Sequence, residues 1–163
     1  MHGNNFRANH GASHANRGQQ RGGQGQWEQQ QQECAALWRT IHIKPQAEEP
    51  LPVDLFSTTA EKVAKMLNER NTNRYTQVRK FYDELTMWQE KINQDPEKFM
   101  EYLPFVQMLN AKAAYAQARK HVSPCFVSFI QHCLTQMDTP ESFRHGKLFF
   151  EAFMGYYRVE KSD

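Results

Sequence analysis

The fold is decided by residues 78–92, which have the sequence VRKFYDELTMWQEKI. Apolar side chains recur in this stretch at steps of three and four residues; they are Val78, Phe81, Tyr82, Leu85, Trp88 and Ile92. Residues with this spacing lie on one face of an α-helix, because the helix has about 3.6 residues per turn. The stretch therefore predicts an amphipathic helix, over about residues 75–92, that buries one face against other helices.

Helix start signals recur on both sides of this stretch. A capping residue followed directly by proline occurs at Asp95-Pro96, Ser123-Pro124 and Thr139-Pro140. The capping side chain accepts a backbone N–H, and proline fits the first helical position because no N–H is needed there. A capping box at Thr58 and Glu61 opens an earlier helix. No Asn-Gly or Asp-Gly hairpin turn occurs between residues 57 and 158. The sequence therefore predicts an all-α fold, with a five-helix bundle over residues 57–158.

The rest of the chain differs in composition from the bundle. Residues 1–33 are rich in Gly, Asn, Gln, His and Arg and almost lack aliphatic side chains. Such a segment buries too little apolar surface to offset its ordering entropy. We expect a low-complexity, disordered arm there, then a short apolar patch and Pro-rich linker over 34–56, and a tail over 159–163. One Arg-Gly-Gly step at 21–23 leaves two interpretations of the arm, a solvated tail or a weak RNA-contacting segment.

Composition sets the broad class of protein. The formal net charge is only +2, so bulk charge alone does not indicate a nucleic-acid partner. The three cysteines, Cys34, Cys125 and Cys133, are an odd and sparse set. They indicate an intracellular, reducing compartment rather than a secreted disulfide scaffold. Because no apolar run approaches a membrane span and the N-terminus has no signal-peptide core, we expect a cytoplasmic protein.

Residues 104–120 predict a helix that is apolar around most of its circumference, as expected of a central helix in a bundle. On this helix Lys112 and Arg119 share almost the same bearing, about 10.5 Å apart along the axis. The sequence has no acidic side chain between Glu101 and Asp138. Because burying two unpaired cations is costly, the strip either opens to solvent or to an anion such as a backbone phosphate, or pairs with a carboxylate from another helix. These residues alone leave both interpretations open.

Two other helices carry features with alternative interpretations. Arg79 and Lys80 each precede a carboxylate by four residues, which favours ordinary ion pairs within the helix. Phe149 and Tyr156 form a second aromatic strip on the last helix. This strip is either covered by a neighbouring segment or forms a protein–protein contact surface.

The sequence contains no recognisable catalytic motif. It has no phosphate-binding loop, nucleophile elbow or zinc-protease helix. His121 and Cys125 have the spacing of a metal pair, but no further ligands are in register. Asp83 and Glu84 point about 100° apart on their helix, so they do not form an acid–base pair. The sequence therefore predicts a protein that is not an enzyme and that has no cofactor and no metal site.

Four segments between residues 75 and 158 share the pattern of a known family. They are VRKFYDEL (78–85), LPFVQMLNAKAAYA (103–116), the pair Arg119-Lys120, and FFEAFMGYY (149–157). These residues resemble the small subunit of type III-A CRISPR (Csm) effector complexes. The resemblance implies a five-helix bundle without an active site, whose copies stack along the guide RNA and its target RNA. Catalysis in such complexes belongs to the backbone subunits and to the polymerase-type large subunit.

The resemblance also implies which residues contact RNA. Lys112, Arg119 and Arg79 match basic positions of the family, and Lys120 is a weaker match. Where relatives often have glycine before the arginine, this chain has Ala118. The expected function is thus non-catalytic binding of RNA phosphates. The expected partners are the guide RNA, the target RNA, the large and backbone subunits, and copies of the chain itself. Two alternatives remain, a helical adaptor without nucleic-acid contact and the small subunit of another type III complex.

Overall fold

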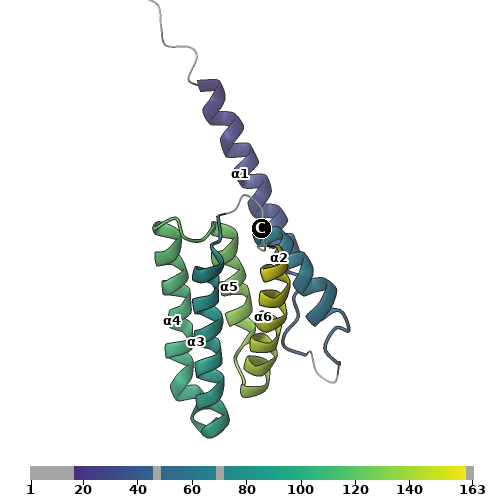
Figure 1. The fold of residues 1–163 in the computed structure, drawn as a ribbon, viewed down its shortest axis with the longest axis vertical. Coiled ribbons are helices and arrows are strands. Elements are labelled where there is room, and N and C mark those ends of the chain that lie inside the picture. Colours follow the sequence, from purple (N-terminus) through teal and green to yellow (C-terminus); the bar gives the residue numbers. More distant parts are fainter. Residues whose placement is uncertain (1–16, 46–48, 69–71, 161–163) are drawn as a thin grey trace, which may run out of the picture.

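The computed structural model describes residues 17–45, 49–68 and 72–160, with side chains from Gly23 onward. Within these ranges the chain forms six α-helices and no strand (Figure 1). The helices are α1 (Arg17–Trp38), α2 (Ala60–Asn68), α3 (Tyr75–Gln94), α4 (Phe99–Ala118), α5 (Pro124–Gln136) and α6 (Pro140–Glu160). The predicted all-α fold is confirmed. Helices α2 to α6 correspond to the five predicted helices, and α1 is an additional one.

Helix α1 is the main difference from the sequence-based expectation. Residues 17–33, predicted as part of a disordered arm, lie within this helix, and residues 1–16 of that arm lie outside the described residues. Glutamine and arginine are good helix formers, and the last turns of α1 supply the buried anchors Cys34 and Trp38. The first turns of α1 extend away from the bundle (Figure 1). Helix propensity and the docking of one end of the helix therefore account together for its order.

A disulfide joins α1 to the bundle. Cys34 is bonded to Cys125 at the start of α5, a pairing that the odd and sparse set of cysteines did not indicate. Trp38 adds a second attachment, since its indole Nε1 donates to the hydroxyl of Ser128 at 2.8 Å. Cys133 is a free, buried thiol whose pKa is raised by its burial. Cys34 and Cys125 are 91 residues apart in sequence, so helical spacing could not indicate their pairing.

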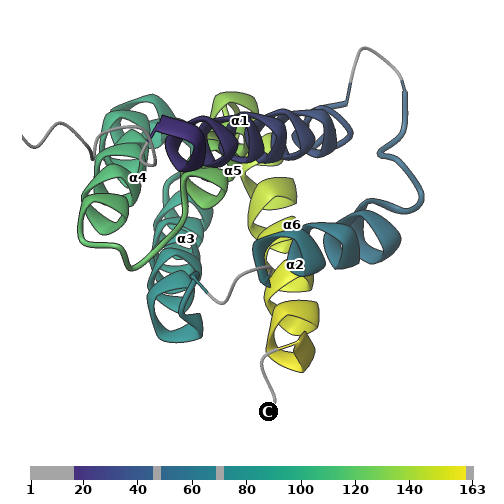
Figure 2. The ribbon, with the colours of Figure 1, turned by 90° about the horizontal axis from the view of Figure 1, so that it is seen from above.

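Residues 41–43, which follow α1, pack against the bundle and form backbone hydrogen bonds with it. Ile41 and Ile43 are fully buried. The N–H of Ile43 donates to Oε1 of Gln136 at 2.8 Å, and its carbonyl lies 3.2 Å from Nδ1 of His145. Residues 41–43 therefore bind the outside of both α5 and α6, and Figure 2 shows α1 lying across α5.

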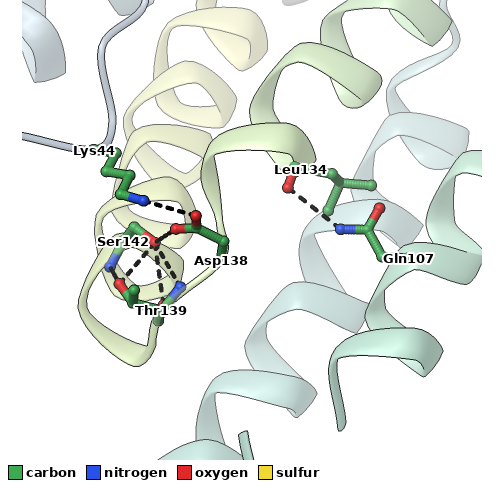
Figure 3. A network of polar contacts seen from close by, with 6 residues as sticks. All are labelled: Lys44, Gln107, Leu134, Asp138, Thr139 and Ser142. Atoms are coloured by element: carbon green, nitrogen blue, oxygen red, sulfur yellow. Dashed lines mark hydrogen bonds and ion pairs between the residues drawn. The ribbon is translucent and has the colours of Figure 1, made fainter. Parts of the chain in front are cut away.

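The turn between α5 and α6 anchors the same segment (Figure 3). Lys44 Nζ lies 2.7 Å from Oδ2 of Asp138. The Lys44 ammonium, which donates to this carboxylate, holds the pKa of Asp138 below its ordinary value. The Ser142 hydroxyl also donates to Asp138, at 3.4 Å, and accepts from the N–H of Thr139 at 3.0 Å. On the other side of the turn, Gln107 of α4 donates to a carbonyl in the last turns of α5 at 3.4 Å.

Two of the predicted helix starts are confirmed and two differ. The Ser123 and Thr139 side chains accept the backbone N–H three residues further on, at 3.2 and 3.1 Å. Thr58 does not open a helix, because a π-helical turn (Leu55–Thr59) already precedes α2. Asp95 forms no side-chain capping bond, and the proline after it opens a 3-10 turn that leads into α4. Local capping chemistry therefore predicted the starts of α5 and α6 but not those of α2 and α4.

Helix α6 occupies the middle of the bundle and packs against α2, α3 and α5. Phe149 is fully buried, and its ring lies 6.2 Å from that of Phe129. Tyr156 is partly buried against the core. The second aromatic strip of α6 is therefore covered by neighbouring parts of the chain, which was one of its two predicted interpretations.

Helix α4 lies at the edge of the bundle rather than at its centre (Figure 1). It packs against α3 and α5, and its other side is open. Phe105, Met108 and Tyr115 are 55%, 52% and 63% exposed. The prediction of a central helix was wrong because apolar side chains, large ones as well as alanines, remain exposed on this open side. In the described ranges, no helix is long and apolar enough to cross a membrane.

Candidate nucleic-acid interface

A groove with a volume of about 390 Å³ runs between α3 and α4, on the open side of the bundle. Its walls are formed by Gln77, Lys80, Phe81, Glu84, Leu109, Lys112, Tyr115, Ala116, Arg119 and His121. The packing of Phe81, Leu109 and Ala116 into the core fixes the spacing of the two helices. The groove therefore has an apolar floor and charged or aromatic rims.

Lys112 lies on the α4 rim of this groove. Its Nζ is 2.7 Å from both carboxylate oxygens of Glu84 on α3. The Lys112 side chain is half exposed, whereas that of Glu84 is only 20% exposed. The structure thus shows the ion pair that the sequence left open as an alternative, and the carboxylate comes from outside the acid-free stretch.

Arg119 follows Lys112 along the same rim. Its Nη1 donates to the Tyr115 hydroxyl at 3.0 Å, and its guanidinium carbon lies 5.7 Å from the centre of the Tyr115 ring. Among the described residues it has no carboxylate partner within 4.0 Å. Arg119 is therefore a cation that the groove holds in place without neutralising it.

The other two predicted RNA-contacting residues lie outside this groove. Arg79 donates from Nε to Oδ1 of Asp83 at 2.8 Å, as its spacing predicted. This bond is the main reason why the pKa of Arg79 is raised. Lys120 instead lines a neighbouring groove, together with Trp27 and Gln30 of α1. The structure thus brings Lys112 and Arg119 together and places Arg79 and Lys120 beside them.

Sequence reasoning missed two basic members of the groove. Lys80 is an exposed residue on the α3 rim, and its expected partner Glu84 is bonded to Lys112 instead. His121 follows α4 and is partly exposed. Lys80 and Glu84 are four residues apart on α3, so a shared face was predictable. That this face of α3 lies opposite Lys112 was not predictable, because it depends on how α3 and α4 pack.

Lys120 has a left-handed backbone conformation with φ of 59°. It follows α4 in a Schellman turn: its N–H donates to the carbonyl of Gln117 at 2.8 Å, and that of His121 to Ala116 at 2.9 Å. Glycine is favoured at this position, because other residues lose about 1–2 kcal/mol in this conformation. The end of α4 therefore carries a lysine at a local energetic cost.

Replacing Lys120 with glycine is expected to raise the free energy of unfolding by about 0.5–1 kcal/mol, since the relief of strain exceeds the extra entropy of the unfolded chain. Urea denaturation followed by circular dichroism measures this change. Lys120→Ala is the control, because it removes the charge but keeps the left-handed strain. Equal stability of the two variants would contradict the prediction.

The described residues contain no cluster of three or more His, Cys, Asp or Glu side chains suited to a metal ion. The candidate pair His121 and Cys125 is not suitable either, since the Cys125 sulfur is bonded to Cys34. What the groove offers a ligand is positive charge, one exposed aromatic ring and hydrogen-bond donors.

Comparison with known proteins assigns a family to this bundle. The family model described as Csm2 Type III-A matches residues 51–163. The chain belongs to the Csm2 family. The match includes α2 to α6 and excludes α1. No curated protein and no solved structure matches the chain. Members of the Csm2 family are small, non-catalytic structural subunits, and membership makes the chain a subunit of a type III-A CRISPR Csm complex.

Proposed function

We propose that this Csm2-family subunit binds RNA phosphates through the groove between α3 and α4 and catalyses no reaction. The observation that carries the proposal is the presence of Lys112 and Arg119 on the same exposed rim, with Lys80 opposite. Phosphate contacts require positive charge and reach but no base recognition. In a guide-directed complex, base pairing recognises the sequence, and a structural subunit need only follow the backbone.

Family membership supports the remaining parts of the proposal. Copies of the subunit stack along the guide RNA and target RNA beside the large and backbone subunits, in the cytoplasm. Arg79 and Lys120 contact phosphates that flank the groove. Both are exposed and lie within a few residues of Lys80 and Arg119. Arg79 contributes less than the groove residues, because Asp83 already neutralises it.

The test is RNA binding by the full chain as salt concentration rises. Each phosphate neutralised on a single strand contributes about −0.7 to the slope of log affinity against log salt. Contacts from Lys80, Lys112 and Arg119 alone predict a slope of about −2, and full contacts from Arg79 and Lys120 would steepen it to about −3.5, with no sequence preference. Fluorescence anisotropy of a labelled single-stranded RNA measures both. A slope near zero, or no binding at low salt, would contradict the proposal.

A second candidate function is a helical adaptor that touches no nucleic acid. It is favoured by the exposure of Phe105 and Met108 on the open side of α4. These side chains lie on the same line as Lys112 but toward the start of the helix. The salt experiment separates the two functions, because an adaptor has no salt-dependent affinity for RNA.

Glu84 competes with RNA for Lys112 in this arrangement. Replacing Glu84 with glutamine is expected to raise the affinity for single-stranded RNA by up to about fivefold, since a partly exposed ion pair contributes up to about 1 kcal/mol. Anisotropy titration at low salt measures the change. Glu61→Gln is the matched control, because it removes the same charge from an ion pair with Lys65 on α2, which does not line the groove. An equal gain in both variants would show a general charge effect rather than competition at Lys112.

A further inference from the structure

Tyr115 is the exposed aromatic side chain of the groove. Of the two aromatic residues on its walls, Phe81 is 6% exposed and Tyr115 is 63% exposed. Tyr115 lies three residues after Lys112 and four before Arg119, so all three share one line on α4. Ala111, Ala114 and Ala118 surround this line on the open side and are themselves exposed. No large side chain of α4 therefore shields the ring at these positions.

Arg119 holds the Tyr115 ring in place. The guanidinium contacts both the ring and the hydroxyl, with the Nη1–Oη distance at 3.0 Å and the cation 5.7 Å from the ring centre. Aromatic rings and arginine guanidinium groups are the surfaces on which unstacked nucleobases bind. A ring that is already oriented loses little conformational entropy when a base stacks on it.

We propose that the Tyr115 ring is a stacking platform for a nucleobase of single-stranded RNA, with Lys112 and Arg119 binding the phosphates on either side. This inference rests on the proposed function, and it narrows the ligand class. Bases in an A-form duplex are already stacked and cannot reach a single surface ring, whereas duplex phosphates can reach Lys112 and Arg119. The groove therefore prefers RNA that offers at least one unpaired and unstacked base, as a single strand does, to a fully paired duplex.

A helix–helix seam would have a similar spacing, since Phe105, Met108, Lys112, Tyr115 and Arg119 alternate steps of three and four residues. The seam positions of paired helices are mainly apolar. The half of the line that carries Tyr115 has two cations at those positions, and Arg119 lacks a carboxylate partner among the described residues. This half suits a polyanion with flat bases better than it suits another helix.

The test uses the full chain and two labelled RNAs of about 12 nucleotides, a length within the range that small domains bind. One is single-stranded oligoadenylate, and the other has the same ribose-phosphate chain with abasic sites throughout. Tyr115→Leu removes the ring, whereas Tyr115→Phe keeps it and removes only the hydroxyl. Phe105→Leu is the matched control, because it removes another exposed ring on the same line, away from the cations.

Tyr115→Leu is expected to lower the affinity for oligoadenylate about tenfold, since stacking on one side chain has an effect of this size. Tyr115→Phe and Phe105→Leu should stay within about twofold of the wild type. The salt slope should not change, because the phosphate contacts are the same. On abasic RNA, the wild type and Tyr115→Leu should bind equally.

Two results would overturn the platform while leaving phosphate binding intact. One is wild-type affinity of Tyr115→Leu for oligoadenylate. The other is an equal loss on both RNAs, which would mean that Tyr115 acts only by positioning Arg119. Failure of the wild type to bind either RNA at low salt would instead refute the proposed function itself.

Discussion

Replacing Lys112 and Arg119 together with glutamate is expected to abolish the binding of single-stranded RNA, with a loss of at least about a hundredfold at low salt. The two substitutions remove both cations from the α4 rim and place a carboxylate opposite Glu84, whose oxygens lie 2.7 Å from Lys112 Nζ. Phosphates entering the groove would then meet three negative charges and only Lys80 and His121 as partners. Anisotropy titration measures the loss.

The control for this double variant is Lys91→Glu with Lys98→Glu. It changes the net charge by the same amount, and both residues lie toward the other end of α3 and the turn after it. We expect the control to weaken binding only slightly and the salt slope to stay near that of the wild type. Circular dichroism should show helical protein in both variants, because all four side chains are on the surface. Equal losses would show that RNA follows the overall charge and not this groove.

The candidate site was predictable from sequence only where a single helix forms it. Lys112 and Arg119 share a face because of helical periodicity alone, and Arg79 pairs with Asp83 for the same reason. The ion pair between Lys112 and Glu84 joins residues 28 positions apart. It depends on how α3 and α4 pack, and no single-helix pattern contains that information. Residues 102–137 contain no acidic side chain, but the folded protein brings the carboxylate of Glu84 next to this stretch.

The fold was predictable to the extent that local chemistry decides it. Ser123 and Thr139 cap their helices with their own side chains, so the starts of α5 and α6 followed from sequence. The order of α1 depends on long-range attachment through Cys34 and Trp38, to residues 91 and 90 positions away. The edge position of α4 was missed because an apolar pattern does not distinguish an alanine face that is buried from one that is open.

Replacing Phe129 with alanine is expected to have the largest effect on stability. The Phe129 ring is fully buried and has five aromatic neighbours, at centroid distances of 5.3 to 6.2 Å. These neighbours are Trp38, Phe126, Phe149, Phe150 and Phe153. Truncating such a side chain removes its transfer free energy and leaves a cavity, at a cost of about 3–5 kcal/mol. Domains have only about 5–15 kcal/mol in total, so the variant should unfold roughly 10 °C or more below the wild type.

Phe105→Ala is the matched control, since it makes the same change at a ring that is 55% exposed and lies beside Trp88. It should cost less than about 1 kcal/mol, because water already reaches that side chain. Thermal and urea unfolding of the full chain measure both variants.

Phe129 also contacts Trp38 of α1, which lies outside the family match. If Trp38→Ala lowers stability by much less than Phe129→Ala, α2 to α6 are stable without α1. If Trp38→Ala and Phe129→Ala lower stability by similar amounts, α1 is part of the core. Equal losses for Phe129→Ala and Phe105→Ala would contradict the prediction that the aromatic cluster stabilises the fold.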